Sequence, residues 1–196
     1  MKKILIVVDM QNDFITGSLG SLLTQNVVPN VTERVRKAMI DNEAIIFTQD
    51  THNADYLSTP EGAKLPVEHC IAGTEGWKII PELIDVQGEF EYTDYAIIEK
   101  PIFGSVKLME FLNENWDFNG LDIPEIEFIG VCTDICVVSN ALMAKSYFPN
   151  AKISVDASCC AGTTINNHLS AIDVMRSCQI DIIEPEEKIL EKELVR

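Results

Sequence analysis

The sequence predicts an α/β fold built on a doubly wound, parallel sheet of six strands. Short apolar segments rich in Ile and Val recur along the chain, and most of them are followed by a segment with helical periodicity. Strands that are buried on both faces are apolar throughout, and alternation of strand and helix is typical of this fold class. The length of 196 residues suits a single domain spanning residues 1–196.

The order of elements follows from these patterns. The predicted strands are KILIVVD (3–9), EAIIFTQD (43–50), YAIIEK (95–100), EIEFIGV (125–131), KISVDA (152–157) and QIDIIE (179–184). Four helices are predicted, each with one apolar face toward the core. The helix after Pro29 has Val31, Val35 and Met39 on that face, and the helix after FGS has Val106, Met109 and Leu112. The helix after CTDIC has Val138, Leu142 and Met143, and the helix after GTT has Leu169, Ile172 and Met175. Residues 51–94 break the alternation, with one short helical pattern (GWKIIPELI) and a predicted hairpin near VQGEFEY. Long irregular segments inside domains are often functional.

Charge and composition exclude several classes of protein. Fifteen basic residues face 31 acidic ones, for a net charge of −16, so the chain repels phosphate backbones and anionic membranes. We expect no nucleic-acid partner and no membrane partner. The apolar run that ends at Val8 is too short to cross a bilayer, and Asp9 interrupts it without a cleavage site, so we expect a cytoplasmic protein. The six cysteines are then expected to be reduced.

Polar residues lie at the predicted ends of four strands. Asp9 ends the first, Asp50 the second and Lys100 the third, and Cys136 follows the fourth. Ligands of open α/β sheets bind at the carboxyl ends of the strands. A purely structural sheet does not need a carboxylate, an ammonium and a thiol on one rim, so we interpret this rim as a candidate active site.

Cys136 is the candidate nucleophile. Asp134 is predicted to cap the following helix, which places Cys136 in its first turn. Free amides and the helix dipole there favour a thiolate, and the same amides can hold an oxyanion. Asp9 is the candidate acid/base, and Lys100 would support both negative charges. The alternatives are a buried, inert Cys136, a redox pair with Cys132, an Asp9 that only caps a turn, and a solvated Lys100.

A metal site is predicted separately. Asp50 and His52 are two residues apart, so in an extended chain they point the same way. His69 completes a set of two histidines and a carboxylate, with Glu61 nearby, which suits zinc, iron or manganese. The alternative is a solvated turn. His168 is interpreted as a surface or packing residue.

Five motifs together carry a family resemblance. They are VVDMQNDF (7–14), TQDTH (48–52), LPVEHCIAGTEGW (65–77), EKPIFGS (99–105) and GVCTDICV (130–137). In this order they resemble the isochorismatase-like cysteine hydrolases, and within that family the nicotinamidase group, over essentially the whole chain. The resemblance implies a three-layer α/β/α sandwich with strand order 3-2-1-4-5-6, and a homo-oligomer.

The resemblance also assigns site residues. It implies a catalytic triad of Asp9, Lys100 and Cys136, and an oxyanion hole formed by the amides of Cys132 and Cys136 beside a cis peptide between Val131 and Cys132. It also implies one divalent metal ion, zinc with iron or manganese as alternatives, bound by Asp50, His52 and His69, with Glu61 at the place of a further acidic ligand. The implied substrate contacts are Phe14, Phe103, Trp77 and Val131. Two positions depart from the family pattern. Thr51 replaces an aromatic residue, and Phe103 stands where a tyrosine is usual.

The implied activity is deamidation of nicotinamide to nicotinate and ammonia through a Cys136 thioester, a reaction of NAD salvage. Another small amide or ureide hydrolase of the same superfamily is the nearest alternative. An isochorismatase proper is disfavoured because those enzymes lack the nucleophilic cysteine. A non-catalytic thiol protein and a metal-dependent binding module are the alternatives from other classes.

Overall fold

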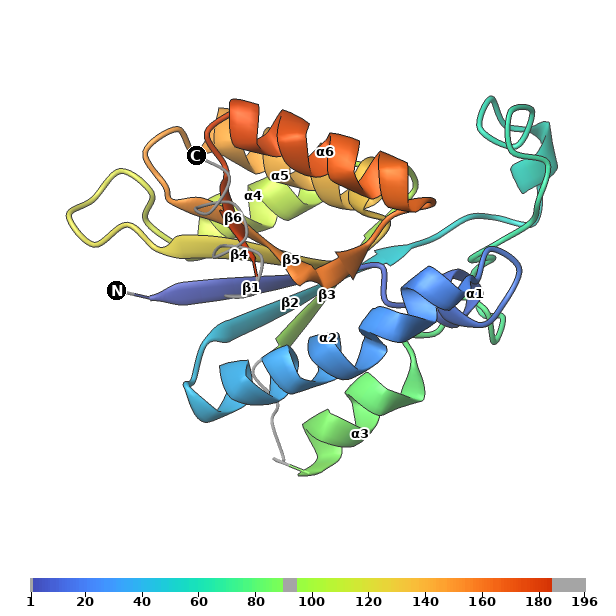
Figure 1. Ribbon diagram of the computed structural model, residues 1–196, viewed down its shortest axis with the longest axis horizontal. Coiled ribbons are helices and arrows are strands. Elements are labelled where there is room, and N and C mark those ends of the chain that lie inside the picture. The colour runs from blue at the N-terminus through green and yellow to red at the C-terminus, as the bar shows by residue number, and fades with distance from the viewer. Residues whose placement is uncertain (1, 90–94, 185–196) are drawn as a thin grey trace, which may run out of the picture.

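Six parallel strands form one sheet at the centre of the molecule (Figure 1). The computed structural model describes residues 2–89 and 95–184. The strands are β1 (Lys3–Val8), β2 (Ala44–Asp50), β3 (Tyr95–Lys100), β4 (Glu125–Val131), β5 (Ile153–Ala161) and β6 (Asp181–Ile183). Their order in the sheet is β3-β2-β1-β4-β5-β6, so the predicted fold class and strand order are confirmed.

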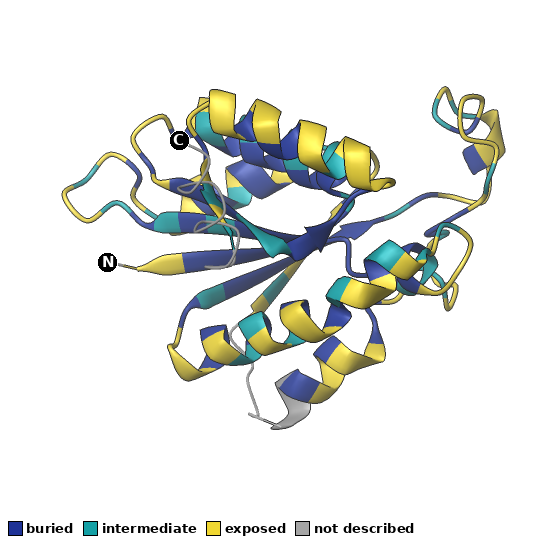
Figure 2. Ribbon diagram, viewed as in Figure 1, coloured by how far each residue is buried: buried dark blue, intermediate teal, exposed yellow. Residues whose placement is uncertain are grey.

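Helices cover both faces of this sheet. The helices are α1 (Asn12–Ile15), α2 (Leu22–Ile40), α3 (Pro81–Glu89), α4 (Val106–Asn115), α5 (Val138–Tyr147) and α6 (Ile165–Ser177). Figure 1 shows α1, α2 and α3 on one side of the sheet and α4, α5 and α6 on the other. Because side chains of a strand alternate between faces, the sheet divides the core into two buried apolar clusters (Figure 2).

The start of α2 differs from the prediction. The helix begins at Leu22 and contains Pro29, whereas the sequence predicted a start after Pro29. Ser21 and Thr24 form a reciprocal capping box at its first turn, which supplies the amides at the helix start with partners. The cap and the burial of Val31 and Val35 offset the hydrogen bond that an interior proline removes.

Two predicted core residues prove to be exposed. Val106 of α4 is 60% exposed and Leu169 of α6 is 49% exposed, whereas Leu108 and Ala171 are buried. The buried residues are Leu108, Met109 and Leu112 in α4 and Ala171, Ile172 and Met175 in α6, so the face of each helix that packs on the sheet is offset from the predicted one. The hairpin predicted near VQGEFEY is also wrong for residues 86–89, which continue α3; its remaining residues lie outside the described part of the chain.

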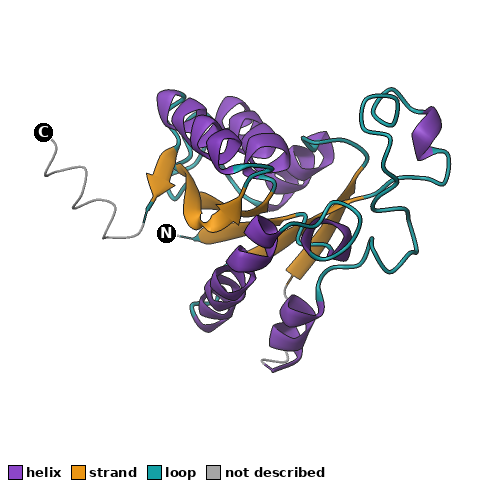
Figure 3. Cartoon of the chain, turned by 45° about the vertical axis from the view of Figure 1, so that its right-hand side comes forward, coloured by secondary structure: helices purple, strands orange, loops and turns teal. Residues whose placement is uncertain are grey.

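The irregular segment between β2 and α3 lies at the carboxyl ends of the strands. Figure 3 shows it as long loops on that side of the sheet. It contains one short 3-10 helix (Tyr56–Ser58), and two isolated bridges, His52 with Ile71 and Gln11 with Ile79, hold it in place. The loop therefore covers the rim where the predicted site residues lie. Among the described residues, no helix combines the length and hydrophobicity needed to cross a bilayer.

Candidate active site

Asp9 is held at the end of β1 by Thr48 of the neighbouring strand. Asp9 is completely buried, and its backbone has a φ of 48°. The Thr48 hydroxyl donates to Asp9 Oδ1 at 2.6 Å, and the Asp9 amide donates to the same hydroxyl at 3.2 Å. The two contacts orient the carboxylate so that its other oxygen, Oδ2, faces away from Thr48. Thr48 lies within TQDTH, but its contact with Asp9 was not predicted.

Lys100, the last residue of β3, joins the predicted groups. It is 1% exposed, so the alternative of a solvated lysine is wrong. Its Nζ lies 2.7 Å from Asp9 Oδ2 and 3.2 Å from Asp50 Oδ1, and it donates to Cys136 Sγ at 3.5 Å. One ammonium therefore links the predicted base, the predicted nucleophile and a predicted metal ligand.

Electrostatics set the resting charges of these groups. Burial by itself would lower the pKa of Lys100, but Asp9, Cys136 and Asp50 raise that pKa well above its ordinary value, so Lys100 is charged at neutral pH. Burial, with Asp50, raises the pKa of Asp9 against the opposing effect of Lys100. A raised carboxyl pKa brings Asp9 closer to the range in which a group exchanges protons near neutral pH.

The Cys136 thiol is neutral at rest. Burial and the charge of Asp9 raise its pKa well above the ordinary value, although Lys100 opposes this. Desolvation and the charge of Asp9 therefore oppose the thiolate that was expected at the helix start. Asp9 Oδ2 is paired with Lys100 Nζ at 2.7 Å, and Asp9 also interacts with the Cys136 thiol, so the carboxylate is placed to accept the thiol proton.

The turn that carries Cys136 is a π-helical turn, Thr133–Val137, between β4 and α5. Its N-cap is Cys132, so the prediction that Asp134 caps this helix is wrong. The Asp134 carboxylate instead accepts hydrogen bonds from the Thr163 amide and hydroxyl, at 2.8 and 2.5 Å. The peptide bond between Val131 and Cys132 is cis, as the resemblance implied. All six cysteines are free thiols.

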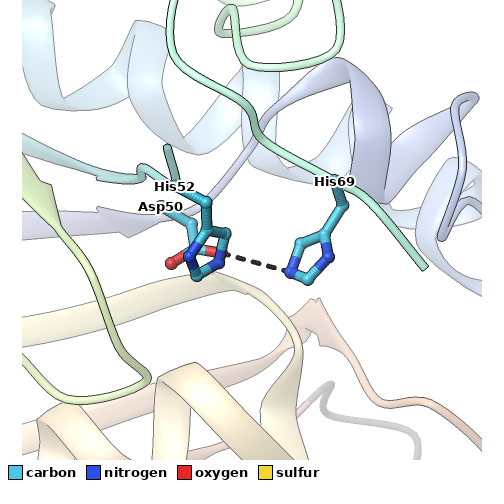
Figure 4. Close-up of side chains that lie close together, drawn as sticks. All are labelled: Asp50, His52 and His69. Atoms are coloured by element: carbon cyan, nitrogen blue, oxygen red, sulfur yellow. Dashed lines mark hydrogen bonds and ion pairs between the residues drawn. The ribbon is translucent and has the colours of Figure 1, made fainter. Parts of the chain in front are cut away.

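Asp50, His52 and His69 form a buried cluster (Figure 4). Lys100 contacts it through Asp50. Asp50 Oδ2 lies 3.0 Å from His52 Nε2 and 3.5 Å from His69 Nε2. Potential ligand atoms of the three residues all lie within 4.8 Å of one another. His69 Nδ1 donates to the Val67 carbonyl at 2.9 Å, which leaves Nε2 as the atom that faces the cluster. Two imidazole nitrogens and one carboxylate oxygen fit zinc, iron or manganese.

Two further residues surround this cluster. Glu61 Oε1 lies 3.9 Å from both His52 Nε2 and His69 Nε2, so it borders the site as the resemblance implied. The buried ring of Tyr56 packs against His52 and His69, with centroids 4.6 and 4.9 Å away. These contacts hold the imidazoles in position, and the alternative of a solvated turn is wrong.

A cavity of about 230 Å³ is lined by Cys136 and, from the candidate metal site, by Asp50, His69 and Glu61. Most of its remaining wall is apolar, and Phe14 and Phe103 are among the lining residues. The ring of Phe14 meets His69 edge to face, with centroids 5.7 Å apart. A larger hollow of about 850 Å³ lies at the amino ends of the strands, but none of the candidate site residues lines it.

Trp77 and Val131 do not line this cavity, in contrast to the other predicted substrate contacts. Val131 is completely buried in the core. The Trp77 indole donates to Thr51 Oγ1 at 2.9 Å. Trp77 thus packs beside the residue that departs from the family pattern, and its carbonyl accepts a hydrogen bond from Gln11.

Gln11 was not predicted as a site residue. Its side chain accepts from the Asp50 amide at 2.7 Å and donates to the Asp50 carbonyl at 2.9 Å and to the Trp77 carbonyl at 2.7 Å. It therefore holds the end of β2 where Asp50 lies. The MQNDF stretch was noted as a motif, but the partners of a glutamine cannot be found from local spacing.

The sequence of this chain is similar to those of known proteins. Residues 3–187 match the model of the isochorismatase domain. The nicotinamidase of Schizosaccharomyces pombe is 28% identical over 223 residues, covering 95% of each chain. The nicotinamidase/pyrazinamidase of Mycobacterium tuberculosis is 25% identical, covering 91% of this chain and 97% of its own.

Solved structures show the same fold. The pyrazinamidase of Pyrococcus horikoshii in complex with zinc superposes with a TM-score of 0.78 at 25% identity, covering 94% of this chain and all of its own. The nicotinamidase/pyrazinamidase PncA of Bacillus subtilis has a TM-score of 0.81 at 24% identity, with the same coverage. With the sheet order and the match over nearly its whole length, the chain belongs to the isochorismatase domain family.

Proposed function

We propose that the protein is a metal-assisted cysteine amidase that hydrolyses nicotinamide to nicotinate and ammonia. The observation that carries the proposal is the contact of Asp9 and Cys136 with one buried ammonium, Lys100, beside a small cavity with apolar walls. The family match and the curated relatives named nicotinamidases support an amidohydrolase.

The first half-reaction forms a thioester. Cys136 Sγ attacks the amide carbonyl carbon while Asp9 takes the thiol proton, so no free thiolate is needed. The carbonyl π electrons move to oxygen, and the backbone amides of Cys132 and Cys136 are the predicted donors to this oxyanion. Loss of one such donor typically costs about 10²–10³ in rate. The oxyanion then re-forms the carbonyl, Asp9 returns its proton to the departing nitrogen, and ammonia leaves.

The second half-reaction restores the enzyme. Asp9 takes a proton from water as the water oxygen attacks the thioester carbonyl. Collapse of the second tetrahedral intermediate breaks the carbon–sulfur bond, and Asp9 gives the proton to the departing sulfur. Nicotinic acid is released and ionises in solution. Lys100 keeps its charge in both halves and supports each anionic state.

Asp50, His52 and His69 would hold a divalent ion at the wall of the same cavity, with Glu61 beside it. When bound there, such an ion supplies a Lewis acid that attracts electron pairs of the substrate. The volume of about 230 Å³ is below the range usual for drug-sized ligands. A compound with a single ring and a carboxamide fits this space better than a nucleotide does.

The deciding experiment is an ammonia-release assay with the purified, metal-loaded protein. The panel comprises nicotinamide, pyrazinamide and N-carbamoyl amino acids. A kcat/KM for nicotinamide above about 10⁴ M⁻¹s⁻¹ supports the proposal. Release from the carbamoyl compounds alone would make the protein a ureide hydrolase, and no release from any compound would leave the amidase proposal without support.

His69→Ala is expected to lower bound zinc from about one equivalent to below about 0.2. The variant removes one of three donors and leaves Asp50 and His52, which are too few for tight binding. Metal content after dialysis, measured by mass spectrometry, checks this. His168→Ala is the control, because His168 lies outside the cluster and contacts the Thr133 hydroxyl. Full zinc in His69→Ala would contradict the assignment.

Phe14→Leu is expected to raise KM for nicotinamide about three- to tenfold, with a smaller effect on kcat. The leucine keeps an apolar wall but loses aromatic contact, which is worth about 0.5–1.5 kcal/mol. Steady-state kinetics checks this, with Phe111→Leu on α4, remote from the cavity, as the control. An unchanged KM would show that the substrate ring does not contact Phe14.

A further inference from the structure

Asn140 is a buried side chain of α5 that has no assigned role. It lies one turn after Cys136 and is completely buried. Its Nδ2 donates to the Cys136 carbonyl at 2.8 Å and to the Phe103 carbonyl at 3.0 Å, and its Oδ1 accepts from the Ser105 amide at 2.9 Å. A buried amide is costly unless its polar atoms are bonded. Here it bonds three backbone groups from two separate segments.

One of these segments is the loop 101–105, which connects β3 to α4. The loop begins directly after Lys100, and it places the Phe103 ring in the wall of the cavity. It ends at Ser105, whose hydroxyl accepts from the Leu108 amide at 3.0 Å and caps α4. The loop therefore connects the ammonium of the site to one wall of the cavity.

The same loop packs closely on α5. A Cβ atom added at Gly104 would lie 2.5 Å from Met143 Sδ, so the backbone there lies directly on the helix. Phe103 is 40% exposed, so packing of its side chain fixes its position only in part. Its position therefore depends on the loop backbone, which Asn140 ties to the carbonyl of Cys136.

We infer that Asn140 is a positioning residue that sets the distance between the Phe103 wall and Cys136, and thereby limits the size of ring that the cavity admits. The inference rests on the proposed function for its substrate, a six-membered ring carboxamide. The nucleophile and the wall belong to different segments, and the three hydrogen bonds of Asn140 join them. The native enzyme therefore prefers an unsubstituted ring to one that carries a methyl group on the side of Phe103.

The first variant is Asn140→Asp, which keeps the acceptor for the Ser105 amide but removes both donors. Two carbonyl oxygens then face a carboxylate, and the loop is expected to move outward. The measured ratio is the kcat/KM for nicotinamide divided by the kcat/KM for the best of the ring-methylated nicotinamides. This ratio should fall at least about fivefold, because apolar pockets discriminate against one added methyl group by about 10–200-fold and the variant loses part of that discrimination. The change should appear mainly in KM.

A matched control and a milder variant accompany it. Asn115 of α4 is exposed, and its Nδ2 also donates to the carbonyl four residues earlier, that of Phe111, at 2.8 Å. Asn115→Asp should leave the ratio unchanged.

Asn140→Ser retains a hydroxyl that can bond the Cys136 carbonyl, as Ser139 bonds Ile135, but it is too short to reach the loop. It should shift the ratio in the same direction even if Asn140→Asp fails to fold.

Phe103→Ala tests whether Asn140 acts on ring size through the position of Phe103. It removes the wall and leaves the hydrogen bonds of Asn140 in place, so it should shift the ratio as Asn140→Ser does. The double variant should shift it no further, because the two changes act on one wall. An equal fall in kcat/KM for all rings in both Asn140 variants would show that Asn140 only stabilises the fold, and would overturn the inference.

Alkylation of Cys136 separates this inference from the proposed function. Rates of modification by iodoacetamide and by the bulkier iodoacetanilide are measured on the Cys136 peptide by mass spectrometry. The rate with iodoacetanilide divided by the rate with iodoacetamide should rise about fivefold in Asn140→Ser and stay constant in Asn115→Asp. The expected size is taken from the discrimination of apolar pockets against one methyl group. This ratio is informative even if the native protein hydrolyses no amide, and an unchanged ratio would overturn the inference.

Discussion

Cys136→Ala is expected to lower kcat for ammonia release by at least about 10⁴-fold, which is the scale of loss when a nucleophile is removed. The alanine has no atom that can form the thioester, and Asp9 has no thiol proton to take. The fold should survive, because Cys136 is a small residue that packs in the core cluster. Removal of one buried sulfur typically costs about 1–2 kcal/mol. The assay measures nicotinamide turnover, and thermal melting and zinc content show that the variant is folded and loaded.

Cys178→Ala is the matched control for this prediction. Cys178 is an exposed free thiol at the end of α6, so its removal tests whether loss of any cysteine reduces activity. It should turn over like the native enzyme. Activity of Cys136→Ala within tenfold of the native value would contradict the nucleophile assignment and favour the metal-dependent alternatives.

Lys100→Met is expected to lower both stability and activity. The substitution keeps an unbranched chain but leaves Asp9 and Asp50 as buried carboxylates without their common counter-charge. Breaking a buried pair in this way typically costs about 3–5 kcal/mol of the free energy of unfolding. The kcat should fall at least about 10³-fold, because the anionic states of the reaction lose their support. Urea unfolding and the ammonia assay measure the two effects.

Lys78→Met is the matched control. Lys78 pairs with Glu75 at 2.6 Å, but both side chains are exposed, and exposed pairs contribute about 0–1 kcal/mol. The control should therefore unfold within about 1 kcal/mol of the native protein and keep its activity. Equal stability of Lys100→Met and Lys78→Met would show that Lys100 is not a buried counter-charge.

The stability difference between native protein and Lys100→Met should depend on pH in one direction. The folded state raises the pKa of Lys100 above its ordinary value of 10.5, so the folded protein holds this proton more tightly than the unfolded chain does. The contribution of Lys100 is then fully present below pH 10.5, and it is lost as the pH rises through the folded-state pKa. Urea titrations at about pH 7, about pH 9 and pH values above about 10 would measure it.

Some expectations about the site followed from strand ends alone. Parallel strands present their carboxyl ends at one edge, so residues that end different strands lie close together whatever their separation in the chain. This is why Asp9, Asp50 and Lys100 are neighbours in the structure, as predicted. His52 joined them through its two-residue spacing from Asp50. These expectations needed only the periodicity of apolar residues and the order of the motifs.

Other features depended on contacts that no local pattern contains. Thr48, Gln11 and Asn140 each bond groups at least 35 residues away in the chain, and many polar residues of these types make no such contact. The start of α2 was missed because a capping box outweighed the proline signal. Trp77 was placed in the substrate pocket by analogy, but its indole bonds Thr51 instead.

The sequence by itself determined the fold class, the strand order through the family resemblance, and the identities of the groups on the rim. Only the tertiary structure decided their charge states and their separations. The Cys136 thiol is neutral because it is buried beside Asp9, and Lys100 stays charged because the carboxylates of Asp9 and Asp50 lie next to it. Burial and distance arise only when the chain is packed, because the cost of charge depends on how far water and counter-charges are from each group.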